Sequence, residues 1–359
     1  MKEGWEYKKL GEVCEIYQPK TISSDMLVRD GKYLVYGANG VIGRYNLYNH
    51  EQSEVLMTCR GATCGTINIS QPYSWINGNA MVIHPKGEDI SQTFLKHLLR
   101  GIDLSIVITG AAQPQITRQS LKPIIIPVPP LSEQKRIVEE LDLLSSIIEK
   151  KKAQLKELDS LAQSIFYDMF GDNNYEIVTL GEVVEIKSTL VSPTDLPYSE
   201  MLHVSPSNII SNVGSIVDCV KAKEESLISG KYTFSKGMIL YSKIRPNLNK
   251  VAIPNFDGIC SADMYPLSIK GKVNSIFIWR LLLSKGFLEY AIKHSGRARM
   301  PKLNREALFA YRFPLPPLPL QQQFAEKVEA IEHQKEMIKQ SIKEVETLIN
   351  SRMDYYFNG

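Results

Sequence analysis

No stretch of this sequence approaches the roughly 18–20 consecutive apolar residues that a membrane-spanning helix needs. The N-terminal stretch MKEGWEYKKLGEVCEI also lacks the apolar core and the small-residue cleavage site of a signal peptide. We therefore expect a cytoplasmic protein with no membrane partner. The length of 359 residues predicts two or three domains.

Cysteine is scarce, and its positions are scattered: Cys14, Cys59, Cys64, Cys219 and Cys260. A structural zinc site needs two closely spaced pairs of ligands, and Cys59 and Cys64 have no second pair nearby. The histidines show no ligand spacing such as H-E-x-x-H. We expect no metal site, and reduced thiols in or near the core.

Catalytic motifs are also missing. The glycine-rich YGANGVIG is not G-x-x-x-x-G-K-[ST], and no lysine follows it, so we interpret it as a turn between two strands. The adenine-methyltransferase string Asn-Pro-Pro-Tyr occurs nowhere. Glu185-Ile186-Lys187 weakly resembles part of a nuclease pattern, but the first copy of the repeat described below has Tyr17 in place of the lysine. We expect no catalytic residue in this chain.

What the sequence does contain is an internal repeat. KLGEVCEI at 9–16 recurs as TLGEVVEI at 179–186, an offset of 170 residues. Further along, PPLSEQ recurs as PPLPLQ, which aligns Gln134 with Gln321 at an offset of 187. The chain is therefore two copies of one unit, and the second copy has 17 extra residues between Ile186 and about Gly296.

Each copy ends in a run with heptad spacing and no internal glycine, and prolines precede each run. The predicted helix-pairing positions are Ile137, Leu141, Leu144, Ile148, Leu155 and Leu158 in the first run, and Phe324, Val328, Ile331, Ile338, Ile342 and Val345 in the second. Lys151 and Lys335 interrupt these seams. Helices of about 60 Å with such narrow apolar stripes need a partner. We expect the two to pair antiparallel; the alternative is that each helix packs only on its own domain.

The predicted fold class is α+β. Short β-branched and aromatic runs broken by Gly, Pro and Asn fill the middle of each copy and predict strands, while SQTFLKHLLRGI and SIFIWRLLLSKGFLEYAI predict helices. We therefore expect two mixed α/β globular domains, two long antiparallel coiled-coil helices and a pseudo-twofold internal repeat. Each helical run has a net charge of −2, so the rest of the chain carries +7, a modest footprint for a polyanionic partner.

This organisation resembles the specificity subunit of type I restriction–modification enzymes. The resemblance lies in the order and duplication of YKKLGEVCEI, TGAAQPQITRQSLKPIIIPVPPLSEQKRIV, KGMILYSKIRPNLNKVAI and FPLPPLPLQQQFA, and it covers essentially the whole chain. It implies target recognition domains at 1–130 and 172–317, with spacer helices at 131–171 and 318–359. Leu320 departs from the repeat, because the first copy has Glu133 before its glutamine.

The resemblance also implies partners. Each recognition domain would read one half of a split site in double-stranded DNA. The helices would separate the half-sites and dock two methyltransferase subunits, which carry S-adenosylmethionine and methylate adenine. Motor and nuclease restriction subunits would cut unmethylated DNA. This chain would hold no cofactor and do no chemistry.

DNA contacts call for Lys and Arg at phosphates, and for Arg, Lys, Asn, Gln and small polar residues at base edges. The candidates in the first copy are Arg60, Thr63, Gln113, Gln115, Thr117 and Arg118. Those in the second are Lys243, Arg245, Asn247, Asn249, Lys250, Arg297, Arg299, Lys302, Asn304 and Arg305. Arg118 and Arg305 recur at matched positions, which favours a phosphate contact or an internal salt bridge over base reading.

Two other interpretations remain open at this point. One is a coiled-coil interaction scaffold with two protein-binding domains and no DNA binding. The other is an enzyme hidden in the globular domains, which the missing motifs make improbable. Salt-dependent binding to duplex DNA would favour a DNA-reading specificity subunit, and protein partners alone would favour the scaffold.

Overall fold

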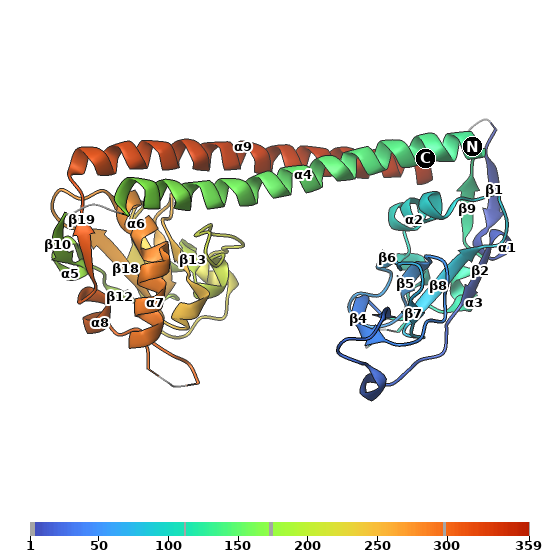
Figure 1. Cartoon of the computed structure of the whole chain (residues 1–359), viewed down its shortest axis with the longest axis horizontal. Helices are drawn as coiled ribbons and strands as arrows, with labels where there is room; N and C mark the ends of the chain where they lie inside the picture. Colours follow the sequence, from blue (N-terminus) through green and yellow to red (C-terminus); the bar gives the residue numbers. More distant parts are fainter. Residues whose placement is uncertain (1–3, 111–112, 172–174, 297–298, 359) are drawn as a thin grey trace. The chain divides into compact units, whose positions relative to one another are not determined.

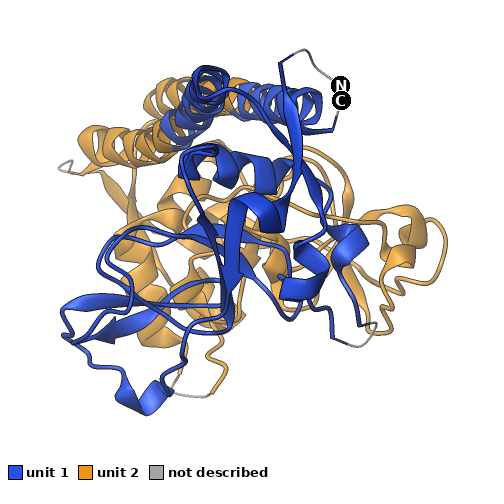
Figure 2. Cartoon of the chain, turned by 90° about the vertical axis from the view of Figure 1, so that its right-hand side faces the viewer, with its two compact units in different colours: residues 1–152, 339–359 blue, residues 153–338 orange. Residues whose placement is uncertain are grey.

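The computed structural model describes residues 4–110, 113–171, 175–296 and 299–358. It forms two compact units: unit 1 comprises residues 1–152 and 339–359, and unit 2 comprises residues 153–338. Figure 2 shows that both long helices change colour along their length, so each unit contains part of each helix. Among the described residues, no helix is long and apolar enough to cross a membrane.

The described residues of unit 1 form three small antiparallel or mixed sheets (Figure 1). Strand β1 pairs with β9, a four-stranded sheet has the order β2-β8-β5-β6, and a three-stranded sheet has the order β4-β3-β7. The bounds are β1 Glu6–Lys9, α1 Leu10–Val13, β2 Cys14–Tyr17, β3 Tyr33–Gly37, β4 Gly40–Tyr45, β5 Val55–Thr58, β6 Ile67–Ile69, β7 Trp75–Ile76, β8 Ala80–Pro85, α2 Gln92–Gly101, α3 Arg118–Leu121 and β9 Ile125–Val128. YGANGVIG forms the β3–β4 hairpin, so the predicted turn between strands is confirmed.

Unit 2 repeats this plan. Strand β10 pairs with β19, and a four-stranded sheet has the order β11-β18-β15-β16. The bounds are β10 Glu176–Thr179, α5 Leu180–Val183, β11 Val184–Ile186, β15 Ile239–Ser242, β16 Val251–Ala252, β18 Met264–Ile269, α6 Ser275–Leu283, α7 Lys285–His294, α8 Arg305–Phe309 and β19 Arg312–Leu315. The mixed α and β class and the internal repeat are therefore confirmed.

Where the second copy is longer, it has a larger second sheet. The order of this sheet is β12-β14-β17-β13, in the place where unit 1 has only three strands. Its strands are β12 Leu190–Val191, β13 Leu202–Val204, β14 Lys231–Phe234 and β17 Gly258–Ser261. They lie within the stretch where the sequence predicted the extra residues, because the frame on either side aligns with unit 1 and the middle does not.

The two long helices are α4, Leu131–Phe170, and α9, Leu318–Phe357. In unit 1 Arg136 contacts Tyr356 and Glu140 contacts Arg352. In unit 2 Asp159 contacts Lys335 and Phe166 contacts Phe324. As the residue number rises along α4 it falls along α9, so within each unit the two segments run antiparallel, as predicted.

All twelve predicted helix-pairing residues are buried or half-buried. Six are buried: Ile137, Leu141, Ile148, Phe324, Val328 and Ile331. The other six, Leu144, Leu155, Leu158, Ile338, Ile342 and Val345, are half-buried. Lys151 is half-buried as well, whereas the side chain of Lys335 is only 2% exposed.

The ends of the helices complete the cores of both units. In unit 1, Ile137 and Leu141 near the start of α4 share one apolar cluster with Tyr356 and Phe357 at the end of α9. In unit 2, Phe324 and Val328 near the start of α9 share a cluster with Phe166 and Phe170 at the end of α4. Each core therefore contains residues from both copies of the repeat.

The recurring glutamine fastens each long helix to its globular domain. Gln134 is fully buried: its Oε1 accepts from the Ser91 N–H at 2.8 Å, and its Nε2 donates to the carbonyls of Asp89 and Pro129. Gln321 accepts from the Asn274 N–H at 2.9 Å and donates to the Pro316 carbonyl at 2.7 Å. Ser91 and Asn274 are the N-cap residues of α2 and α6, so one amide links three chain segments in each unit.

All five cysteines are free thiols, and Cys14, Cys59 and Cys260 are buried, as predicted. Burial raises the pKa of the Cys14 and Cys260 thiols to about 12, so neither is a nucleophile at neutral pH.

Candidate nucleic-acid interface

In unit 1, two loops from distant parts of the sequence lie side by side. The loop after β5 and the loop before α3 form an isolated antiparallel bridge at Arg60 and Gln115. The Gly61 N–H donates to the Pro114 carbonyl at 3.0 Å, and the Ile116 N–H donates to the Cys59 carbonyl at 3.0 Å. We call residues 59–66 and 113–118 the first paired loops.

The first paired loops border a polar cavity of about 370 Å³. Its lining includes Arg60, Arg118 and Lys122 as cations and Gln18, Gln115 and Gln119 as amides. Among the described residues that line it, none carries a carboxylate. Cations with amides that donate and accept in one concave site suit a phosphate backbone and base edges.

Unit 2 has the same pairing with different side chains. Ile244 and Lys302 form the bridge, the Arg245 N–H donates to the Pro301 carbonyl at 2.8 Å, and the Leu303 N–H donates to the Lys243 carbonyl at 2.8 Å. Residues 243–250 and 299–305 are the second paired loops. The bridge and these two backbone hydrogen bonds match their counterparts in unit 1.

The cationic side chains of the second paired loops make different contacts with neighbouring residues. The Lys243 ammonium lies 5.3 Å from the ring centre of Tyr265, and Lys302 forms a loose ion pair with Asp263 at 3.7 Å. The Arg305 guanidinium lies 5.2 Å from the ring centre of Phe309. These contacts leave Lys302 and Arg305 exposed.

Most of the predicted DNA-contact residues are exposed. These are Arg60, Thr63, Gln113, Gln115, Thr117 and Arg118 in unit 1, and Arg245, Asn247, Arg299, Lys302, Asn304 and Arg305 in unit 2. Thr117 and Asn304 also cap α3 and α8, because their side chains accept from Ser120 N–H and Ala307 N–H. Arg297 lies outside the described residues.

Two of the predicted DNA-contact residues, Asn249 and Lys250, are not exposed. The Asn249 side chain is buried, and its Nδ2 donates to Asn212 Oδ1 and to the Leu283 carbonyl, both at 3.1 Å, so it braces the loop and does not face a ligand. Lys250 is half-buried, and its ammonium donates to the Pro206 carbonyl at 2.5 Å. The loop turns back on itself at residues 245–249, where the Leu248 and Asn249 N–H groups donate to the carbonyls of Arg245 and Pro246.

The sequence did not reveal Gln18, Gln119 or Lys122 as lining residues. Gln119 and Lys122 follow Arg118 in and just after α3, but Glu306 and Phe309 occupy their positions in the second copy. Gln18 comes from the end of β2 and is far away in sequence. No repeat or short motif marks any of the three.

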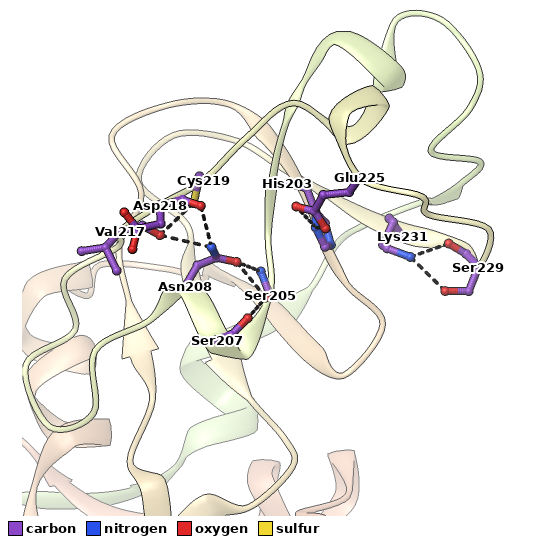
Figure 3. Close-up of polar contacts among 10 residues, drawn as sticks. All are labelled: His203, Ser205, Ser207, Asn208, Val217, Asp218, Cys219, Glu225, Ser229 and Lys231. Atoms are coloured by element: carbon purple, nitrogen blue, oxygen red, sulfur yellow. Dashed lines mark hydrogen bonds and ion pairs between the residues drawn. The ribbon is translucent and has the colours of Figure 1, made fainter. Parts of the chain in front are cut away.

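The second sheet of unit 2 carries a separate group of polar contacts (Figure 3). Asn208 accepts from the Ser205 N–H at 2.9 Å and donates to the carbonyls of Val217 and Asp218. It thereby ties together both ends of the loop at 205–218.

Two buried basic residues, His203 and Lys231, contact the ends of the segment 225–229 in the same part of unit 2. His203 Nδ1 lies 3.1 Å from Glu225 Oε2, and burial keeps the pKa of this histidine below its ordinary value. Lys231 donates to the carbonyl and hydroxyl of Ser229, and burial lowers the pKa of its ammonium. Figure 3 shows both contacts. These contacts anchor both ends of the segment 225–229.

Within the described ranges, no cluster of three or more His, Cys, Asp or Glu side chains could hold a metal ion. The paired loops offer donors, acceptors and positive charge. Such a surface suits the binding of a polyanion.

Comparisons with known proteins match both copies of the repeat. A family model described as "Type I restriction modification DNA specificity domain" matches residues 2–159 and 172–347. The type I restriction enzyme EcoDI specificity subunit of Escherichia coli is 29% identical over 370 aligned positions, covering 91% of this chain and 81% of the relative.

Two solved structures share the fold. The S subunit of a type I restriction–modification system from M. genitalium superimposes with a TM-score of 0.58 at 14% identity, covering 98% of this chain and 96% of the other. A chain from a structure on complex assembly and conformational transition of the type I R-M system gives 0.57 at 17% identity, covering 99% and 97%.

Proposed function

Since the chain belongs to the type I restriction–modification DNA specificity family, with both copies of its repeat matched, we propose that each unit reads one half of a split site in double-stranded DNA. A protein of this family is a recognition subunit and not the catalytic one. The observation that carries the proposal is that both units hold the same paired loops in the same backbone hydrogen bonds but present different side chains from them. A shared frame with unlike contacts suits two unlike half-sites.

The proposal assigns DNA contact to the exposed polar side chains of the paired loops. Sequence-independent affinity would come from cations at phosphates, and sequence preference from amides and guanidinium groups at base edges. Arg118 and Arg305 occupy the first position of α3 and α8, and this equivalence supports a phosphate contact in both halves.

The two long helices would set the separation of the half-sites and dock two methyltransferase subunits. Those subunits would supply S-adenosylmethionine and methylate adenine, and motor and nuclease subunits would join them for restriction. The names of the relatives, which are specificity subunits of restriction enzymes, support these partners. A cytoplasmic location, where the DNA lies, belongs to the same proposal.

The test uses the chain together with its methyltransferase partner in a host that lacks other adenine methylation. Methylated positions mapped across the genome should define a motif of two short specific parts separated by unspecified bases. Exchange of residues 17–108 for those of a relative should rewrite one part and leave the other part and the spacing unchanged.

Binding measurements complete the test. The purified complex should bind duplex DNA with an affinity that falls steeply as salt rises, since phosphate contacts release counterions. A continuous methylation motif would contradict the proposal. So would an exchange of residues 17–108 that rewrote both parts of the motif. Protein partners without any DNA binding would favour an interaction scaffold instead.

A further inference from the structure

Arg245 occupies a backbone conformation that L-amino acids rarely adopt. Its φ is +46° and its ψ is +59°, in the left-handed region. A non-glycine residue pays a steric cost there because its Cβ crowds the following carbonyl. An exposed arginine in this conformation therefore needs a reason.

The first copy of the repeat avoids this cost. The matched hydrogen bonds to Pro114 and Pro301 place Gly61 at the position of Arg245, and Gly61 has a φ of +86°. A Cβ built on Gly61 would meet nothing within 4 Å, so glycine is not there to make room. Glycine relieves backbone strain at this position in unit 1, and unit 2 has arginine instead.

A second left-handed residue in the same loop shows what structural compensation looks like. Asn249 has a φ of +47°, and its matched residue in unit 1, Gly65, has a φ of +90°. Asparagine tolerates this conformation better than most residues, and the Asn249 side chain is buried in two hydrogen bonds. Its amide therefore contributes to the fold.

Arg245 has no such compensation. Its side chain is exposed, and within the described residues its guanidinium makes no hydrogen bond or ion pair. Its backbone, in contrast, is tightly held: its N–H donates to the Pro301 carbonyl at 2.8 Å, and its own carbonyl accepts from the Leu248 N–H at 2.9 Å. The loop thus presents an unpartnered guanidinium from a fixed and costly backbone position.

Building on the proposed function, we propose that Arg245 is a specificity-determining residue of unit 2 and that it reads the major-groove edge of a guanine. Guanine offers two adjacent acceptors, O6 and N7, and the planar guanidinium donates to both at once. A fixed backbone lowers the entropy lost on binding, which is a reason to keep strain at a recognition site. Unit 1 has no side chain at the matched position, so its half-site should lack this contact.

The informative variant is Arg245→Gly, because strain and recognition predict opposite effects. Loss of strain should leave the melting temperature of the complex unchanged or raise it by up to about 4 °C. Loss of the contact should relax one position of one half-site, where guanine preference should fall by about 10- to 100-fold. The other half-site should stay unchanged in methylation mapped across the genome.

Two further variants separate the alternatives. Arg245→Lys keeps the charge and the strained backbone but cannot donate in the same bidentate way, so it should also relax the guanine position while leaving the salt dependence of binding unchanged. Asp218→Gly changes another left-handed residue of unit 2, with a φ of +51°, outside the paired loops. It controls for strain relief and should leave both half-sites intact.

The inference is wrong if Arg245→Gly leaves both half-sites unchanged, or if it lowers the melting temperature and weakens all sites alike. A uniform loss of affinity with a shallower salt slope would assign Arg245 to a phosphate and would also overturn guanine reading. If the unaltered complex modified no split site, the proposed function itself would fail, and this inference would fail with it.

Discussion

The ammonium of Lys335 lies 2.7 Å from the Asp159 carboxylate, although the lysine side chain is only 2% exposed. A second carboxylate, that of Glu332, lies 3.0 Å away on the same helix, and Glu332 also accepts from the buried Arg280 at 2.8 Å. The lysine that interrupts the apolar seam of α9 is therefore held by charges on both long helices within unit 2.

Asp159→Asn should destabilise unit 2 by about 2 kcal/mol, because it removes one of the two charges that compensate a buried ammonium. Lys335→Met should cost less than about 1 kcal/mol, since it removes the charge and keeps the volume. Thermal unfolding of the single and double variants measures the coupling. A double variant as unstable as Asp159→Asn alone would show that the ion pair is not the reason.

The Arg352–Glu140 pair predicts a pH dependence in unit 1. Glu140 accepts from the Arg352 guanidinium, which lowers the pKa of this carboxyl, and the Tyr356 hydroxyl donates to it at 2.6 Å. A depressed pKa in the folded state stabilises above the ordinary pKa near 4.5, and the effect is lost as pH falls through the folded value.

Glu140→Gln should therefore lower stability by about 1 kcal/mol at pH 7, a modest figure because the pair is partly exposed. As the pH falls through the lowered pKa of Glu140, the difference in stability between the variant and the parent should disappear. The neighbouring Glu139 provides the control, because it is exposed and its nearest cation, the Lys135 ammonium, lies at the longer distance of 3.9 Å. Equal losses for both glutamine variants at pH 7 would contradict the assignment.

Gln134→Ala and Gln321→Ala should each cost about 2 kcal/mol, since each leaves a buried N–H and one or more buried carbonyls without a partner. Gln134→Ala should lower the unfolding transition of unit 1 and Gln321→Ala that of unit 2. Gln322→Ala, one residue along and exposed, should change neither. Denaturant unfolding followed by hydrogen exchange in each unit would detect the difference.

Carboxylates placed in the helix seam should reveal how burial varies along it. Ile331→Asp should cost about 3 kcal/mol or more, because Ile331 is only 6% exposed, and Leu144→Asp should cost less because Leu144 is half-buried. Leu143→Asp is the matched control, since Leu143 is 63% exposed. Unchanged melting of Ile331→Asp would refute the pairing of the helices.

The repeat and the helices could be predicted from sequence because their signals are local. Heptad spacing identified twelve seam positions that are all at least half-buried, and the shared LGEV and PPL segments identified the frame. The departure at Leu320 also has a physical explanation. Glu133 forms an ion pair with Arg136 at 2.6 Å, whereas Leu320 packs against the core of unit 2.

The site was harder to predict because its geometry depends on backbone conformation and on distant partners. The residue sequence SKIRPNLNK does not indicate that Arg245 and Asn249 both adopt left-handed conformations, or that the side chain of Asn249 is buried. The pairing of residues 59–66 with 113–118 joins loops far apart in sequence, so composition gave only a set of candidates. Gly61 and Arg245 can be matched only by comparing the backbone hydrogen bonds that they donate to Pro114 and Pro301.

The mixed origin of each core has a consequence for synthesis. The core of unit 2 lies within residues 153–338, but that of unit 1 also needs Tyr356 and Phe357, which are made after unit 2 is complete. A chain that emerges from the ribosome N-terminus first can therefore close its second globular domain before its first. Until the last turns of α9 are made, the apolar surface around Phe94 and Gly101, which Phe357 covers in the folded chain, stays exposed. Chaperones and proteases would encounter the first domain during this interval.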